Sequence, residues 1–204
     1  MLYEFAVLTT GVSQTLLAVP GIKAYVSAGE ARGKLVGCWH SEFGPQNRVI
    51  VLRAFEGKKD LDAERERGLA STNPFGCAQY LTAVSMESFA PFRDMPPVKT
   101  GGLGPVYEFR SYILKPGALP ETLDAWAVMV PKRTKLSPLV IAMYALDGPP
   151  RFTHIWAYPG WDERMSIRAQ ALRERVWPPS SAPHTLTPNM VSEVYLPTDI
   201  SPLQ

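Results

Sequence analysis

Residues 36–55 read VGCWHSEFGPQNRVIVLRAF, two strand-like runs separated by a turn-like run. The runs 36–41 and 48–55 are rich in β-branched and aromatic residues, which favour strands. The residues between them include Gly, Pro and Asn, which favour turns. This stretch therefore predicts a β-hairpin. Because side chains alternate along a strand, one face of its second strand is expected to carry Asn47, Val49, Val51, Arg53 and Phe55.

A second hairpin pattern follows about a hundred residues later, at 139–158 (LVIAMYALDGPPRFTHIWAY). Other segments repeat at the same distance: Tyr3-Glu4-Phe5 matches Tyr107-Glu108-Phe109, an offset of 104 residues. The face that corresponds to the one above carries Phe152, His154, Trp156 and Tyr158. The chain is therefore an internal duplication.

Each copy reads β-α-β-β-α-β, the ferredoxin-like order. We expect strands at 2–8, 79–86, 106–114 and 190–196 in addition to the hairpins. A first helix is expected at 13–19, and residues 22–32 could continue it, although Pro20 is expected to interrupt the two. Further helices are expected at 61–69 with a solvated charged face, from Pro120, and at 161–176. In the last helix Asp162 is the expected N-cap, and Met165, Ala169 and Leu172 are expected to face inward.

A sheet covered by helices on one side needs cover on its other face. The duplication therefore predicts an α+β fold, two tandem ferredoxin-like repeats packed sheet to sheet as an α/β barrel. The expected division is a first repeat at 1–94, a linker rich in Pro and Gly at 95–104, and a second repeat at 105–204.

Composition excludes several classes of partner. The 204 residues are 46% hydrophobic, and their net charge of +2 comes from 21 scattered Lys and Arg. Without a basic cluster, no nucleic-acid partner is predicted. No apolar run approaches the roughly 20 residues that span a bilayer, and the N-terminus resembles neither a signal peptide nor a presequence, so no membrane partner and a cytoplasmic location are expected.

Cysteine and histidine usage predicts neither a metal site nor a cofactor. Cys38 and Cys77 suit a reducing compartment, although a disulfide between them stays open. His40, His154 and His184 are far apart in the chain, and no metal-binding spacing is present.

Several spaced motifs resemble the NIPSNAP family: YEFRSY with KPG at 107–117, WHSEFGPQN at 39–47, and HIWAY at 154–158 followed by a charged helix that ends at Trp177-Pro178. The resemblance covers most of the chain as two tandem copies. It implies membership of the dimeric α/β-barrel superfamily, which includes cofactor-free monooxygenases, haem-handling enzymes and small-molecule isomerases or lyases.

The two copies divide the family motif between them. The first keeps the hairpin 39–47, whereas the second keeps His154-Ile155-Trp156 and has Asp147-Gly148-Pro149-Pro150 at its turn. Arg110 and Tyr112 have no counterparts in the first strand of copy one. We therefore expect one asymmetric functional pocket rather than two equivalent sites.

His154 is the leading catalytic candidate, because an imidazole can act as a general base near neutral pH. A core histidine bonded to the backbone and a haem ligand are the alternatives. Arg110 could clamp a carboxylate and Tyr112 could donate to an oxyanion, unless Arg110 simply pairs with Glu108.

In the first copy, His40 and Glu42 lie two residues apart on one strand face and could form an acid–base pair. Glu42 and Asn47 could instead stabilise the turn. The side chains expected to bind a flat or apolar substrate are Trp39, Asn47, Tyr144, Trp156 and Tyr158.

These features predict a cofactor-independent enzyme that acts by proton transfer on a small aromatic or polyketide-like metabolite, as an isomerase, lyase or monooxygenase. The alternative is a non-catalytic small-molecule-binding or adaptor protein. A small molecule is the expected partner, and a homo-oligomer is possible. A sizeable pocket with convergent polar groups would favour the enzyme.

Overall fold

The computed structural model describes residues 1–204, which form eight strands, with helices outside them. The strands are β1 (Leu2–Thr10), β2 (Lys34–Phe43), β3 (Arg48–Phe55), β4 (Leu81–Pro91), β5 (Val106–Leu114), β6 (Leu139–Ala145), β7 (Arg151–Tyr158) and β8 (Leu186–Pro197). The α-helices are α1 (Val19–Val26), α2 (Lys58–Ala70), α3 (Leu119–Arg133), α4 (Trp161–Arg173) and α5 (Ala182–Thr185). Single 3-10 turns are η1 (Leu16–Ala18), η2 (Pro74–Gly76) and η3 (Ala78–Tyr80).

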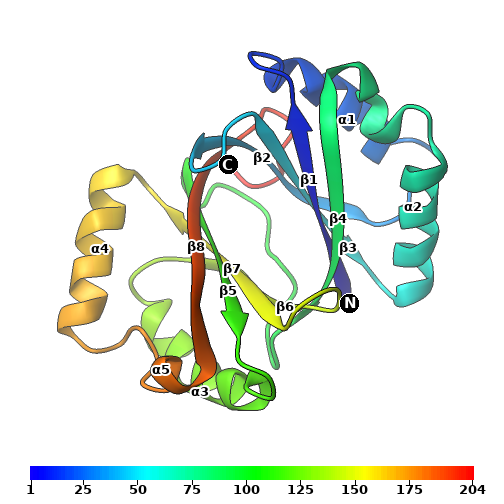
Figure 1. The fold of residues 1–204 in the computed structure, drawn as a ribbon. Coiled ribbons are helices and arrows are strands. Elements are labelled where there is room, and N and C mark those ends of the chain that lie inside the picture. The colour runs from blue at the N-terminus through cyan, green and yellow to red at the C-terminus, as the bar shows by residue number, and fades with distance from the viewer.

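The strands close into one barrel in the order β1-β3-β2-β8-β5-β7-β6-β4. Each repeat supplies four neighbouring strands in the ferredoxin-like order, β4-β1-β3-β2 and β8-β5-β7-β6. Antiparallel pairing of β2 with β8 and of β4 with β6 joins the two halves. The predicted fold is confirmed, and the halves share hydrogen bonds at their edges as well as facing each other. Figure 1 shows α1 and α2 outside one half and α3, α4 and α5 outside the other.

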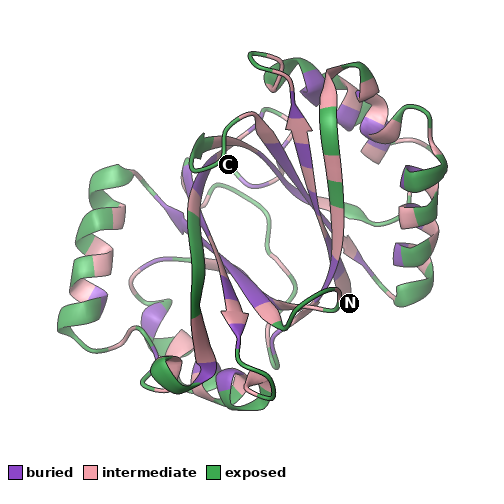
Figure 2. Cartoon of the chain, in the orientation of Figure 1, coloured by how far each residue is buried: buried purple, intermediate pink, exposed green.

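The inside of the barrel is a core that both repeats build. Its 15 buried residues include Trp39, which packs 5.1 Å from Phe109 and 5.4 Å from Tyr107, measured between ring centroids. In Figure 2 buried residues follow the strands, while the outer faces of the helices are exposed. The barrel interior is therefore packed with side chains and supplies stability.

Both predicted hairpins are present, with Cys38 opposite Val51 and Met143 opposite Thr153. In the first, Asn47 adopts a left-handed conformation (φ 58°) at the turn, which Asn tolerates better than most residues. The outer faces of β3 and β7 pack against the helices of their own repeats. The sequence predicted these faces correctly.

Two helix predictions were wrong. Pro20 lies in the first turn of α1 and does not end a helix there, because a proline costs no hydrogen bond at that position. In α4 the cap residue is Gly160, and Met165 and Leu172 are 64% and 59% exposed, whereas Ala171 is buried. The inward face of α4 carries Ile167 and Ala171 together with two arginines that reach a buried carboxylate, and an apolar pattern does not reveal the arginines.

The segment between the repeats pairs with the C-terminus. Gly101 bridges to Leu203, and the Gly104 N–H donates to the carbonyl of Gln204 at 3.0 Å. Gly104 has a φ of +130°, and a Cβ there would lie 2.2 Å from the Tyr158 carbonyl oxygen, so only glycine fits. None of the helices has the length and apolarity needed to cross a membrane.

Candidate functional site

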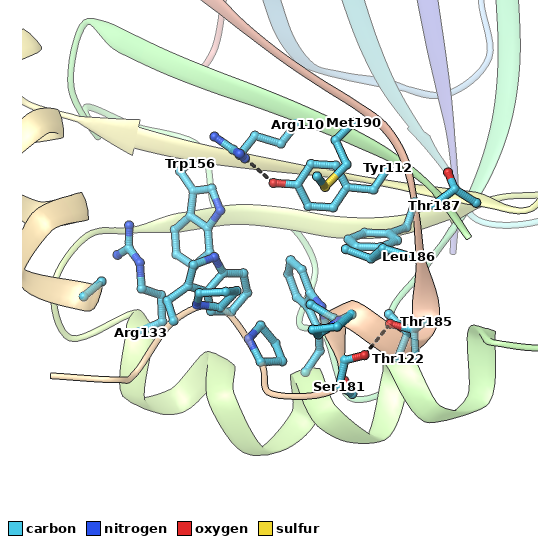
Figure 3. Close-up of a pocket in the computed structure, with 18 of the residues that line it drawn as sticks. Arg110, Tyr112, Thr122, Arg133, Trp156, Ser181, Thr185, Leu186, Thr187 and Met190 are labelled. Carbon is cyan, nitrogen blue, oxygen red and sulfur yellow. Dashed lines mark hydrogen bonds between the residues drawn. The ribbon is translucent and has the colours of Figure 1, made fainter. Parts of the chain in front are cut away.

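A cavity of about 730 Å³ opens in the second repeat, between the outer face of β5 and β7 and the helices α3, α4 and α5 (Figure 3). Aromatic rings make much of its wall: Tyr112, Trp126, Phe152, Trp156, Tyr158 and Trp177. Its size and lining are typical of small-molecule sites. The cavity lies in the copy that carries Arg110 and Tyr112.

The first repeat fills the equivalent space with its own side chains. Phe75 and Cys77 pack with Ile22 of α1 in a buried cluster. Arg53, which aligns with Trp156 of the second repeat, forms buried ion pairs with Glu4 and Glu64. The ion pairs of Arg53 and the segment that carries Phe75 and Cys77 therefore occupy the place where the second repeat has a cavity. Because Glu64 is buried in these ion pairs, the prediction of a fully solvated charged face on α2 was partly wrong.

Glu108 is the charged centre beneath the cavity. Its buried carboxylate pairs with Arg110 at 2.6 Å and with two arginines of α4, Arg164 at 2.7 Å and Arg168 at 3.4 Å. It also accepts hydrogen bonds from the hydroxyls of Tyr158 and Ser192 at 3.2 and 2.9 Å. Although burial raises its pKa, the arginines outweigh burial and lower the pKa to about 2. Glu108 is thus ionised, saturated with donors and unsuited to act as a base.

Arg110 and Tyr112 meet at the cavity wall. The Arg110 Nε–H donates to the Tyr112 hydroxyl oxygen, and Nη1 pairs with Glu108. The predicted pairing of Arg110 with Glu108 is present, and both Arg110 and Tyr112 also line the cavity. Because Arg110 supplies a donor to its oxygen, the Tyr112 hydroxyl is free to donate its own hydrogen to a ligand.

Arg133 reaches the cavity from the last turn of α3. It donates to the hydroxyls of Ser137 and Tyr158, at 2.7 and 3.2 Å, and its guanidinium lies 4.3 Å from the centre of a Trp156 ring. The residue is only 2% exposed. Burial lowers its pKa from the ordinary value of arginine.

His154 lies behind the aromatic wall and is completely buried. Its Nδ1 accepts a hydrogen bond from the Trp156 indole N–H at 2.7 Å, while Nε2 has no partner. Rings of Trp126 and Tyr112 pack edge-on against it, 4.7 and 5.2 Å away between centroids. Burial lowers the pKa of His154 well below its ordinary value, so the imidazole is neutral at pH 7.

This geometry assigns the proton of His154 to Nε2, because Nδ1 is the acceptor for Trp156. A neutral imidazole in that state has no free lone pair with which to take a proton. His154 can therefore donate a hydrogen bond and hold Trp156 in place, and the arrangement does not favour the expected role of general base. It is a core histidine, as one alternative held, but a side chain rather than the backbone bonds it.

The other sequence candidates lie outside the cavity. Trp39 packs inside the barrel, and Tyr144 lies half-buried on β6. In the first hairpin His40 is half-buried and Glu42 is exposed. The Asn47 carbonyl accepts hydrogen bonds from the backbone and hydroxyl of Thr10, at 2.8 and 3.2 Å, which stabilises the turn. The structure therefore unites Arg110, Tyr112, Trp156 and Tyr158 at one cavity, with His154 behind it. The other five candidates lie outside this cavity: Trp39, His40, Glu42, Asn47 and Tyr144.

Sequence reasoning missed Arg133 and Arg168, which line the same cavity. The one signal for the second was the spacing of Arg164 and Arg168, which puts both on one face of α4. No pattern marked Arg133 at a helix end.

No set of three or more His, Cys, Asp and Glu side chains comes together as a metal site. Cys38 and Cys77 are buried and free, and burial raises the pKa of their thiols to about 12 and about 11. They are therefore poor nucleophiles.

Comparisons with known proteins agree on one family. The NIPSNAP family model matches residues 3–84 and 107–202. A NipSnap homolog of Dictyostelium discoideum is 27% identical over 177 residues, covering 84% of this chain and 79% of that protein. The human NipSnap homolog 2 is 27% identical over 180 residues, covering 83% of this chain, which spans 62% of the human protein.

The barrel as a whole resembles solved structures of low sequence identity. An anthrone oxidase-like protein superposes with a TM-score of 0.67 at 10% identity, covering 100% of this chain and 94% of that one. A proposed monooxygenase from Lactobacillus acidophilus NCFM gives 0.65 at 12% identity, covering 96% and 92%. At these identities the likeness shows a shared fold.

Proposed function

Since this chain belongs to the NIPSNAP family, we propose that it is a cofactor-independent enzyme of the α/β-barrel type, acting by proton transfer on a small, flat aromatic or polyketide-like metabolite. The site is the cavity of the second repeat. The observation that carries the proposal is the Arg110–Tyr112 pair set in a wall of aromatic rings. Such a wall suits a planar molecule, and the pair suits negative charge on its oxygen.

The proposed step removes a proton from a carbon that is conjugated with the ring carbonyl of the substrate, as the methylene carbon of anthrone is. The C–H bond breaks, its electron pair moves to the carbonyl oxygen, and the proton passes to water at the mouth of the cavity. The resulting enolate oxygen accepts a hydrogen bond from the Tyr112 hydroxyl beside the positive charge of Arg110. Return of the proton to another position makes the reaction an isomerisation.

Molecular oxygen offers a second fate for the same anion. Anthrone and O₂ give anthraquinone and water, because the methylene carbon is oxidised to a carbonyl while one oxygen atom enters the product and the other is reduced to water. The anion supplies the electrons itself. The name of the anthrone oxidase-like neighbour makes anthrone a reasonable probe for this chain.

The test measures exchange of the anthrone methylene protons in D₂O by NMR, without oxygen. We expect the protein to accelerate exchange. Tyr112→Phe should slow the exchange roughly 10- to 100-fold, because loss of one hydrogen-bond donor to an oxyanion has an effect of about this size or somewhat larger. Tyr144→Phe is the matched control, because Tyr144 lies outside the cavity, and should exchange like the wild type. Equal rates for wild type and Tyr112→Phe would overturn the assignment.

A non-catalytic binding protein is the second candidate. Two observations favour it. The cavity lining contains no Asp or Glu that could act as a base, and the Nδ1 of His154 already accepts a hydrogen bond from Trp156. Saturable binding of anthrone with no acceleration of exchange would support this function over the enzyme.

A further inference from the structure

Arg133 is a buried cation without a carboxylate partner. Its hydrogen bonds go to two neutral hydroxyls, those of Ser137 and Tyr158, and its guanidinium lies over the face of Trp156. No Asp or Glu oxygen lies within ion-pair distance of its nitrogens. Only two of its five N–H groups are used in these contacts.

The surrounding groups cannot supply the missing negative charge. Glu108 is shared by Arg110, Arg164 and Arg168, so one carboxylate already serves three guanidiniums. The Tyr158 hydroxyl is neutral, because burial and the nearby Glu108 carboxylate raise its pKa. The cavity is therefore positive overall, and a buried guanidinium in it lacks the counter-ion that such groups normally have.

Trp156 connects this cation to the aromatic wall. One side of its indole carries Arg133, and its N–H is fixed by His154. Trp177 packs against the same indole at 5.6 Å and against Trp126 at 4.7 Å, between ring centroids. Figure 3 shows Arg133, Trp156, Arg110 and Tyr112 around the same space. An aromatic ring in that space lies beside both a guanidinium and a phenol hydroxyl.

We propose that Arg133 binds a carboxylate of the ligand, which makes the ligand class of this cavity planar aromatic carboxylic acids. The inference rests on the proposed function for the location of the site and adds the group that the site selects. Guanidinium binds carboxylate through two parallel hydrogen bonds, and Arg133 has donors to spare. The oxygen at which charge develops then lies at Arg110 and Tyr112, and the carboxylate lies at Arg133.

The test compares two probes of the same shape, anthraquinone-2-carboxylate and anthraquinone-2-carboxamide, by calorimetric titration at pH 7.5. The wild type should bind the acid at least about tenfold more tightly than the amide, as expected for a charge-assisted bond. Arg133→Gln should weaken binding of the acid roughly 10- to 100-fold and leave the amide almost unchanged. Arg32→Gln, an exposed arginine of the first repeat, should behave as the wild type.

Equal affinities of the wild type for acid and amide would overturn the proposal, and so would an equal loss of both in Arg133→Gln. Loss of the acid preference in Arg110→Gln but not in Arg133→Gln would place the carboxylate at Arg110 instead. If Arg133→Gln fails to fold, Arg133→Lys keeps the charge without the planar fork and should retain only part of the preference. Full retention in the lysine variant would contradict bidentate binding.

These binding measurements do not depend on turnover. A protein that prefers the acid through Arg133 but never accelerates exchange of anthrone protons contradicts the proposed function alone. A protein that accelerates exchange but shows no preference for the acid contradicts the carboxylate site alone.

Discussion

The imidazole of His154 is enclosed by the rings of Tyr112, Trp126, Phe152, Trp156 and Trp177, and one hydrogen bond decides the state of its two nitrogens. Because the Trp156 indole can only donate, Nδ1 must accept and the proton stays on Nε2. Removing the imidazole would leave both an empty space and an unpaired indole N–H. His154 thus supports the site through the position of Trp156.

We predict that His154→Ala lowers the free energy of unfolding by about 2–4 kcal/mol, from the cavity and the orphaned donor together. Stability should also depend on pH through this residue. Its folded pKa is below the ordinary 6.5, so the unfolded chain binds the proton first as the pH falls. Stability from this group is complete above pH 6.5 and decreases below it.

Urea unfolding at pH 7.5 and pH 5.5 measures this dependence, with His154→Phe as the variant that keeps the ring but cannot titrate. The wild type should lose more stability between the two pH values than the variant does. The same loss in both proteins would show that His154 does not contribute.

At the scale of elements, α4 is held to the barrel by charge as well as by the apolar contacts of Ile167 and Ala171. Arg164 and Arg168 reach Glu108 of β5, while Trp161, Met165 and Leu172 of the same helix are exposed. The corresponding network of the first repeat joins Glu4 of β1 and Arg53 of β3 to Glu64 of α2. Both repeats therefore use a buried carboxylate at the same strand position, with different helices attached.

We predict that Glu108→Gln destabilises the protein by about 3–5 kcal/mol, because three arginines lose their shared counter-ion. Hydrogen exchange of the α4 amides should become faster. Since the pKa of Glu108 is lowered to about 2, its stabilisation is present above the ordinary 4.5 and is lost as the pH falls toward 2, so the variant should also lose less stability over that range.

Glu4→Gln is the matched control at the equivalent position of the first repeat. It should destabilise the protein without faster exchange in α4. Faster α4 exchange in Glu4→Gln, or unchanged α4 exchange in Glu108→Gln, would contradict the anchoring role of Glu108.

At the scale of the whole molecule, the closed barrel makes the two repeats depend on each other. The interior cluster draws on both halves, and each half alone would expose its share of that cluster and two strand edges. Because β4 pairs with β6 only at Phe89–Pro91 and β8 pairs with β2 only at Val194–Pro197, the rest of these strands keeps an open side, and a homo-oligomer of this chain is expected to use edges or helices. Oligomeric state, the cytoplasmic location and the boundaries of the two repeats stay predictions.

We predict that residues 1–104 and 105–204, expressed together, assemble into a one-to-one complex that restores the barrel. Expressed singly, each fragment should aggregate or pair with itself to cover the apolar sheet face. Affinity capture of one tagged fragment followed by light scattering tests this. Two soluble monomeric fragments that do not bind each other would show that the interior core does not hold the halves together.

Much of the fold could be read from the sequence because its signals are local. Alternation within 48–55 and 151–158, turn residues between strands and the offset of 104 residues each act over short segments. Arg110, Tyr112, Trp156 and Tyr158 were found for the same reason, since they share faces of two adjacent strands.

The sequence alone determined the duplication and the ferredoxin-like order of each copy, and it predicted one asymmetric pocket rather than two equivalent sites. Only the tertiary structure decided that Arg133 and Arg168 line the cavity and that His154 keeps its proton on Nε2. It also decided that Arg53 and Phe75 fill the first repeat. The physical reason is that long side chains from separate helices and strands converge on one buried carboxylate only in the folded chain. The charge states of these side chains depend on burial and on their partners, which exist only after folding.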